Sequence, residues 1–239
     1  MSTISNHLQD ILAAIQSAKV NAACQQEVKL LAVSKAQPAQ VIREAYLAGQ
    51  TLFGENYLQE ALDKQATLTE LAIEWHFIGP IQSNKTQPIA QHFSWVHSID
   101  RLKIAQRLND ARPANLAPLQ VCIQVNIGDE STKGGVAAHE LESLAVAITA
   151  LPRLKLRGLM AIPPPTEDKN QQRAQFKQVR ECYDTLLAKG FALDTLSIGM
   201  SDDYPIAIEQ GATIVRIGSA LFGARKKLVE IKQDIKNED

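Results

Sequence analysis

Lys35 is the residue of this sequence best suited to form a covalent bond. It ends the run VKLLAVSK at 28–35, whose short length and apolar, β-rich content predict a buried strand. Burial disfavours the charged form of an amine and so lowers its pKa. A neutral amine is a nucleophile that forms a Schiff base with an aldehyde. The sequence therefore predicts a Schiff-base lysine, and the simpler alternative is a lysine that extends from the strand end into water.

Two segments near the end of the chain have the composition of anion-binding loops. They are SIGMSDD at 197–203 and VRIGSA at 215–220. Glycine lets backbone N–H groups approach a ligand, a helix start offers free N–H donors, and serine adds a hydroxyl. The candidate phosphate-binding residues are Met200, Ser201, Gly218 and Ser219. Turns with helix caps have the same composition and are the alternative.

Arg216 lies between two apolar residues of a predicted strand. A guanidinium aimed into the same site would keep a neighbouring ring nitrogen unprotonated by like-charge repulsion. The alternative is a salt bridge across the rim of the fold.

These residues must be positioned by strands and helices that alternate along the chain. The predicted strands are 28–35, 51–55, 73–79, 94–99, 119–127, 154–162, 193–199 and 213–217. The predicted helices between them are 38–48, 57–71, 83–92, 101–111, 137–150, 169–189 and 204–210, with a final helix after 218. Eight strand–helix repeats favour an α/β fold of the (β/α)8 TIM-barrel type. An open doubly wound sheet is the alternative, although no GxGxxG follows the first strand.

The chain is expected to form a single domain over 1–239. Its N-terminal segment predicts an extra helix at about 3–24, which packs outside the barrel or closes its bottom. In such a barrel, chemistry collects at the C-terminal ends of the strands. Polar residues from distant parts of the sequence therefore converge on one rim. Of these, Glu55 is expected to cap the helix 57–71, and His76 and His97 are expected to be hydrogen-bonded core or rim residues.

Composition excludes several classes of function. The 239 residues carry a net charge of -1 and are 45% hydrophobic, which predicts no nucleic-acid or anionic-membrane partner. The three cysteines and five histidines show no metal-ligand spacing, so no metal site is predicted. No apolar run is long enough to span a bilayer, and Asp10 and Gln16 interrupt any signal-peptide core. A cytoplasmic location is therefore expected.

The motifs of this chain resemble those of a known family. They are LLAVSK at 30–35, FGENYLQE at 53–60, WHFIGPIQSNK at 75–85, VHSIDR at 96–101, QVNIGDESTKGG at 124–135, GLMAIPPP at 158–165 and IGMSDDYPIAIEQGATIVRIGSALFGAR at 198–225. On these motifs the sequence resembles the pyridoxal 5′-phosphate (PLP) homeostasis proteins, also described as the YggS/PROSC family. The resemblance implies a barrel similar to the N-terminal domain of alanine racemase.

The resemblance also implies a role for particular residues. PLP would form the Schiff base on Lys35, and Asn56 would line the cofactor. The phosphate positions match Ser201, Gly218 and Ser219, and the arginine at the ring nitrogen matches Arg216. Many members carry a second lysine two residues after the Schiff-base lysine, where this chain has Gln37.

Three functions follow from a Schiff-base lysine in such a barrel. The favoured one is a non-catalytic protein that buffers or delivers PLP, with PLP-dependent apoenzymes as partners, because the racemase-like catalytic domain has no counterpart in the sequence. The second is a small PLP-dependent racemase or lyase that uses Tyr57, Tyr204 or His97 as a second base. The third is an aldolase in which Lys35 attacks a sugar phosphate. A monomer is expected, because a closed barrel has no free sheet edge.

Overall fold

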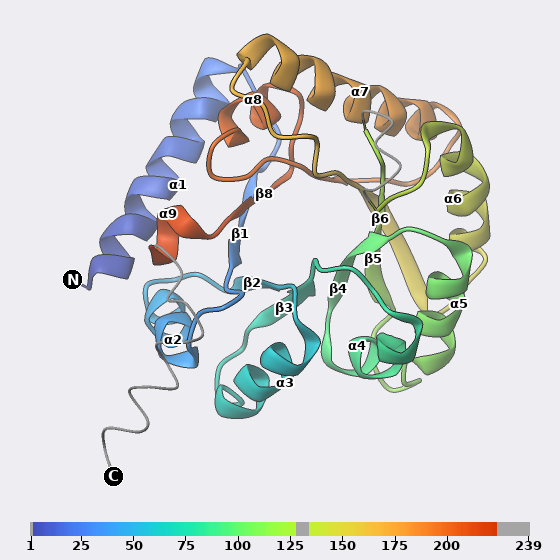
Figure 1. The fold of residues 1–239 in the computed structure, drawn as a ribbon, viewed down its shortest axis with the longest axis horizontal. Helices are drawn as coiled ribbons and strands as arrows, with labels where there is room; N and C mark the ends of the chain where they lie inside the picture. The colour runs from blue at the N-terminus through green and yellow to red at the C-terminus, as the bar shows by residue number, and fades with distance from the viewer. Residues whose placement is uncertain (1, 128–133, 224–239) are drawn as a thin grey trace.

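The computed structural model describes residues 2–127 and 134–223, in which eight parallel strands close into a barrel (Figure 1). The strands are β1 Lys29–Val33, β2 Leu52–Glu55, β3 Glu74–Phe77, β4 Trp95–Ile99, β5 Leu119–Gln124, β6 Leu154–Met160, β7 Thr195–Ser197 and β8 Ile214–Ile217. Each strand pairs with the next, and β8 pairs with β1. The predicted (β/α)8 barrel is confirmed. The alternative of an open sheet is wrong, because the first and last strands of an open sheet do not pair, whereas β1 and β8 do.

Every predicted strand is present, but several end earlier than the apolar runs indicated. The run 28–35 gives a strand that ends at Val33, and the run 119–127 gives a strand that ends at Gln124. Burial continues past the assigned strand ends, at Ser34, Val125 and Ile127, because residues at the barrel mouth are still covered by neighbouring segments. The candidate site residues Lys35 and Asn56 therefore lie in loops just beyond strand ends.

Helices surround the barrel (Figure 1). They are α1 Thr3–Asn21, α2 Ala39–Leu47, α3 Leu58–Thr67, α4 Thr86–His92, α5 Leu102–Ala111, α6 Leu141–Thr149, α7 Lys169–Ala188, α8 Tyr204–Glu209 and α9 Ser219–Phe222, with 3-10 turns η1 Ser83–Lys85 and η2 Ala138–Glu140. The predicted final helix is confirmed as α9, and its continuation after Gly223 lies outside the described residues. The polar segment DESTKGG at 129–135, whose composition makes it a candidate lid, also falls mostly outside them.

The extra N-terminal helix packs outside the barrel, against α8, α9 and α2 (Figure 1). Its buried residues Ile4, Leu8, Ile11 and Ile15 recur at helical spacing and form the packed face. The helix ends at Asn21, three residues before the predicted end. Ala23 has a φ of 51°, and the left-handed conformation of this residue stops the helix.

Two apolar layers hold the barrel. The larger one lies between the strands and the helices, and includes Phe53 of β2 and Ala61 of α3. Smaller clusters, Leu31 with Ile78 and Ile214 and Trp95 with Cys122 and Met160, fill the barrel interior. Side chains alternate along each strand between these two layers, and this alternation decides which polar residues face the interior. Within the described residues, no helix is long and apolar enough to cross a membrane.

Candidate cofactor site

The ends of β1, β2 and β8 bring Lys35, Asn56 and Arg216 to the same end of the barrel. Leu31 faces the interior, so alternation along β1 puts Val33 and then Lys35 on the interior side. Val33 pairs with Gly54, and continuing this register places Lys35 opposite Asn56. Arg216 pairs with Leu31 across β1 and β8. The structure therefore brings these three candidates together, as the sequence predicted for one rim.

Lys35 occupies a tight turn directly after β1. The N–H of Gln37 donates to the carbonyl of Ser34 at 3.1 Å, and Ala36 has a φ of 58°. A positive φ is unfavourable for a residue with a Cβ, so other contacts must hold the turn. Lys35 itself is half-buried there.

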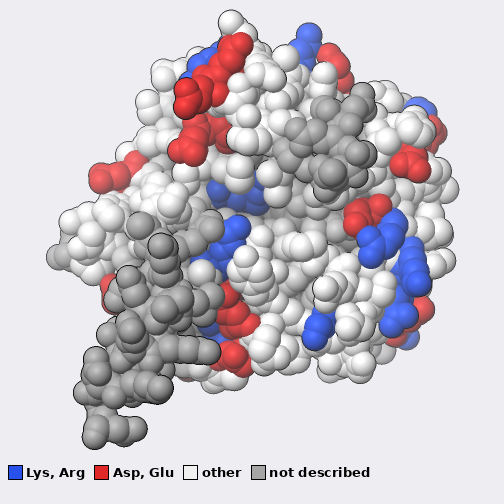
Figure 2. All heavy atoms as spheres, in the orientation of Figure 1, with Lys and Arg blue, Asp and Glu red and all other residues white. Residues whose placement is uncertain are grey.

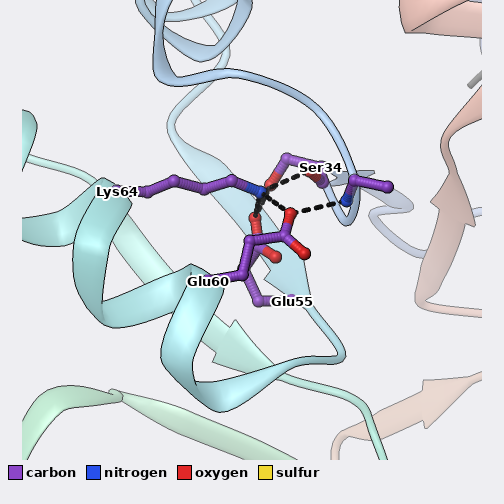
Figure 3. A network of polar contacts seen from close by, with 5 residues as sticks. Ser34, Glu55, Glu60 and Lys64 are labelled. Carbon is purple, nitrogen blue, oxygen red and sulfur yellow. Dashed lines mark hydrogen bonds and ion pairs between the residues drawn. The ribbon is translucent and has the colours of Figure 1, made fainter. Parts of the chain in front are cut away.

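A charged cluster behind the barrel wall holds both neighbours of Lys35 (Figure 3). The Ser34 hydroxyl donates to Glu55 Oε1 at 2.6 Å, and Lys64 Nζ donates to the Ser34 carbonyl at 2.7 Å. The backbone N–H of Ala36 donates to Glu60 Oε1 at 2.6 Å. We call Ser34, Glu55, Glu60 and Lys64 the lysine clamp. The clamp holds the turn from outside the barrel, whereas Lys35 is on the interior side.

The lysine clamp is a buried ion pair rather than a helix cap. Lys64 Nζ lies 2.8 Å from Glu55 Oε1, and the side chains of Lys64 and Glu55 are 6% and 0% exposed. Burial raises the pKa of the Glu55 carboxyl, and the charge and hydrogen bond of Lys64 oppose this shift. The sequence-based interpretation of Glu55 as the cap of the helix after it is wrong. That helix begins after Tyr57 without a side-chain cap, because the Glu55 carboxylate is directed to Ser34 and Lys64 instead.

Arg216 is buried inside the barrel, where it donates to neutral oxygens. Its Nη2 donates to the Ala161 carbonyl at 2.9 Å, and its Nη1 donates to the Ser197 carbonyl and, at 2.9 Å, to Ser197 Oγ. Burial lowers the pKa of the guanidinium to about 10, which leaves it charged at neutral pH. The alternative of a rim salt bridge is not found, because no carboxylate within the described ranges forms an ion pair with Arg216.

Two histidines continue the contacts of Arg216 across the interior. His97 Nδ1 lies 2.9 Å from Ser197 Oγ, and His97 Nε2 lies 2.9 Å from His76 Nδ1. His76 Nε2 in turn lies 2.9 Å from Glu74 Oε1. We call Glu74, His76, His97 and Ser197 the histidine row. Burial lowers the pKa of His76, and it lowers that of His97 further with help from the positive charge of Arg216. The expectation that both histidines are hydrogen-bonded core residues is confirmed.

The two predicted phosphate loops meet at the ends of β7 and β8. Ser219 Oγ lies 3.4 Å from Ser201 Oγ, so residues from two distant segments face one another. A Cβ on Gly218 would lie 3.0 Å from the Val33 carbonyl, so glycine permits a close approach to β1. Gly199 has a φ of 92° and turns the chain after β7.

Met200 differs from the other members of this group. Its N–H donates to Asp203 Oδ1 at 2.6 Å, so that donor is already used within the loop. Asp203, half-buried there, has its pKa raised by desolvation. The Met200 side chain is exposed, and a contact between this residue and a ligand stays a prediction.

The site contains a polar atom that suits a ligand. Asn56 Oδ1 is buried and has no hydrogen-bond partner among the residues that the structure describes. An unsatisfied buried acceptor is costly, and a ligand that donates to it removes that cost. Figure 2 shows Lys and Arg side chains near the middle of the face turned to the viewer, with most visible acidic side chains nearer its edge. A basic centre and serine- and glycine-containing loops fit an anionic ligand such as a phosphate ester.

Comparisons with known proteins agree with this geometry. The family described as alanine racemase, N-terminal domain, matches residues 7–226. The pyridoxal phosphate homeostasis protein of Pseudomonas aeruginosa is 58% identical over 226 residues, covering 94% of this chain and 97% of the relative. That of Escherichia coli K12 is 50% identical over 229 residues, covering 94% and 98%. This chain belongs to the pyridoxal phosphate homeostasis protein family.

Solved structures show the same barrel. PipY of Synechococcus elongatus, solved with PLP bound, is 36% identical with a TM-score of 0.82, covering 92% of this chain and 100% of PipY. Alanine racemase of Corynebacterium glutamicum is 17% identical with a TM-score of 0.69, covering 93% of this chain and 60% of the racemase. The second likeness shows the fold alone. The resemblance to this family that the motifs indicated is therefore confirmed.

Sequence reasoning missed most of the residues that support the site in this family member. Lys64 falls on the buried stripe of α3 between Ala61 and Leu68, and a lysine in that stripe was the available signal. In the sequence, Ser197 is distinguished only as part of the loop 197–203, and no feature marks Glu60 as a residue that supports the site. The link between His76 and His97 needed the alignment of two neighbouring strands, which single residues do not reveal.

Proposed function

We propose that this chain binds pyridoxal 5′-phosphate as a Schiff base on Lys35 and serves in PLP homeostasis without catalysing a reaction of its own. The supporting observation is the meeting of Lys35, Asn56 and Arg216 at one end of a barrel whose 36% identical relative PipY was solved with PLP bound. Ser201, Gly218 and Ser219 would hold the phosphate, with Met200 beside them. The whole chain, 1–239, would act as a single PLP-binding domain.

The chemistry needs only the groups of the site. The neutral Lys35 amine attacks the aldehyde carbon, a C=N bond forms, and the aldehyde oxygen leaves as water. Arg216 keeps the ring nitrogen unprotonated, because two positive charges in contact repel one another. An unprotonated ring is a weaker electron sink, which suits storage better than catalysis.

The non-catalytic role is supported by the positions of the candidate bases. His97 is fully buried, and both of its ring nitrogens are occupied, by His76 and by Ser197. Tyr57 is exposed, and Tyr204 begins α8 beside the phosphate loops. The relatives are named for PLP homeostasis. Partner apoenzymes and a monomeric state belong to this proposal, and the cytoplasmic location stays a prediction.

Mass spectrometry after borohydride reduction tests the covalent bond. Protein incubated with PLP and reduced is expected to carry one pyridoxyl-phosphate group, on the peptide that contains Lys35. Lys35→Ala is expected to lose this adduct completely while retaining some affinity for PLP through the phosphate loops. Lys177→Ala, at an exposed position on α7, is the matched control and is expected to keep it. A stoichiometric adduct on Lys35→Ala would refute the assignment.

Two further measurements separate the proposed role from its alternatives. A PLP-dependent apoenzyme mixed with the loaded protein is expected to regain activity at a rate that differs from activation by free PLP; equal rates would count against delivery. Amino acids incubated with the loaded protein in deuterium oxide are expected to exchange their α-hydrogen no faster than with free PLP. Faster exchange, with loss of the excess in Tyr57→Phe or Tyr204→Phe, would favour the racemase or lyase. A visible absorption band of a PLP Schiff base in freshly purified protein would exclude the sugar-phosphate aldolase.

A further inference from the structure

The histidine row crosses the barrel from one end to the other. Arg216 and Ser197 lie toward the C-terminal ends of β8 and β7, whereas Glu74 is the first residue of β3, at the opposite end. The Glu74 side chain is 46% exposed and borders a cavity of about 430 Å³, which is also lined by Lys29, Trp95 and Arg157. The row therefore connects the predicted cofactor end to an open, water-accessible cavity at the other end of the barrel.

The contacts of the row assign the position of every hydrogen in it. A guanidinium can only donate, so Ser197 Oγ accepts from Arg216 Nη1. The hydroxyl still has one hydrogen and a second lone pair, so it can either donate to His97 Nδ1 at 2.9 Å or accept from it, and the other end of the row decides between the two. If the hydroxyl donates, the neutral imidazole of His97 carries its hydrogen on Nε2, which donates to His76 Nδ1. By the same argument His76 carries its hydrogen on Nε2 and donates to the Glu74 carboxylate, which only accepts.

The opposite assignment does not satisfy the row. A hydrogen on His97 Nδ1 would make Nε2 an acceptor, and His76 would then have to donate from Nδ1. A neutral His76 would in that case present a bare Nε2 to the Glu74 carboxylate at 2.9 Å, where two acceptors repel. The burial of both histidines disfavours the imidazolium form that would relieve this conflict. One direction of donation is therefore built into the row, from Arg216 to Glu74.

We propose that Ser197 and His97 are positioning residues for Arg216, and that the one-way row running to Glu74 holds the guanidinium where it meets the ring nitrogen of the bound PLP. This inference rests on the proposed function for the identity of the ligand. The assignment of hydrogens does not, because it follows from contacts within the chain alone.

The first test uses the protein without PLP. Two-bond ¹H–¹⁵N NMR of histidine-labelled protein at pH 7.5 distinguishes the two neutral tautomers and the imidazolium. His76 and His97 are both expected to carry hydrogen on Nε2 only, with His76→Asn and His97→Asn used to assign the signals. A hydrogen on Nδ1 of His97, or an imidazolium at either position, would overturn the row whatever the protein binds.

The second test measures the loaded protein by its absorption spectrum as a function of pH. Ser197→Ala and His97→Leu remove acceptors from the row, so Arg216 is held less firmly and the ring nitrogen is protonated at a higher pH. The midpoint of the spectral change is expected to move upward in both variants. His97→Asn places an amide oxygen near the former Nδ1 and is expected to restore the wild-type midpoint.

A matched control distinguishes positioning from a general loss of structure. Cys122 is fully buried in the same barrel interior but outside the row, and Cys122→Ala is expected to leave the midpoint unchanged. Unchanged midpoints in Ser197→Ala and His97→Leu, or an equal shift in Cys122→Ala, would overturn the proposal. A missing borohydride adduct on the wild-type protein would instead refute the proposed function, and the NMR result would stand independently of it.

Discussion

The lysine clamp and the histidine row support the two functional groups at the same end of the barrel by different means. The clamp lies between the barrel wall and α3, and holds the turn of Lys35 with a buried ion pair between Lys64 and Glu55. The row lies inside the barrel, and holds Arg216 through hydroxyl and imidazole groups. In the clamp, opposite charges compensate for lost hydration. In the row, compensation comes from matched donors and acceptors.

Because the two regions are stabilised differently, different changes should destabilise them. An ion pair that loses one partner leaves an uncompensated buried charge, so the clamp should be most sensitive to truncation. A row of neutral imidazoles is disrupted when a proton is added, so the row should be most sensitive to acid. Single substitutions and changes of pH can therefore test the difference between the clamp and the row.

Truncation of Lys64 is expected to have the largest effect on stability. Lys64→Met removes the cation that faces Glu55 and the donor to the Ser34 carbonyl, and is expected to lower the free energy of unfolding by about 3 to 5 kcal/mol. Urea unfolding followed by circular dichroism measures this change. Lys177→Met removes an exposed lysine that lies 3.7 Å from Glu181, and this control is expected to cost less than about 0.5 kcal/mol. Equal losses in both variants would show that the clamp is no stronger than a surface pair.

Acid is expected to weaken the row through its histidines. In the unfolded chain both histidines bind protons below a pH of about 6.5, whereas in the folded protein their pKa values are lowered and they bind fewer protons at the same pH. The unfolded state then binds more protons, so stability falls as the pH falls. Two such histidines predict a loss of at most about 2 kcal/mol between pH 6.5 and 5.5. The raised pKa of Glu55 acts in the opposite direction, because the folded state of that group binds a proton more readily.

Variants separate these contributions to the pH dependence. His97→Asn removes the histidine whose pKa is lowered further and is expected to reduce the loss of stability, as measured by urea unfolding at several pH values. His92→Asn, at an exposed position on α4, is the control and is expected to keep the wild-type dependence. If His97→Asn kept the full dependence, the acid sensitivity would have to come from other groups.

The smallest effect is expected at the turn that carries Lys35. Ala36 has a φ of 58°, which disfavours a residue with a Cβ, so Ala36→Gly is expected to change stability by less than about 1 kcal/mol, in the stabilising direction. Ala23, with a φ of 51° at the end of α1, provides a matched control in Ala23→Gly. Thermal unfolding compares the two. Only Ala36→Gly is expected to slow formation of the adduct on Lys35, and equal adduct rates would indicate that the turn geometry does not matter.

The fold was predictable because its signals are local and repeated. Apolar runs of strand length alternate with amphipathic helical stretches eight times, and each repeat gives its own evidence. Boundaries were less predictable. Burial continues beyond the assigned ends of β1 and β5, so the sequence pattern overestimates these strands.

The residues proposed to contact the ligand could also be selected from sequence. These residues lie at strand ends or in glycine-containing turns, where core packing gives no reason for a polar side chain. They are Lys35, Asn56, Arg216 and the two phosphate loops. The supporting residues could not be found in this way. Glu55 was misinterpreted as a helix cap, because its position before a helix is the only feature that a linear pattern displays.

The eight-stranded barrel, the family and the candidate groups at the barrel mouth could be predicted from the sequence, because periodicity and motifs are properties of neighbouring residues. Only the tertiary structure decided that Lys64 of α3 meets Ser34, and that Glu74 is joined to Arg216 through two histidines and Ser197. Apart from the contact of Glu74 with His76 within β3, each of these contacts joins residues of different elements, far apart in the sequence, at about 3 Å, the distance of a hydrogen bond. Strand register and helix packing set those distances, and both depend on every element of the closed barrel at once.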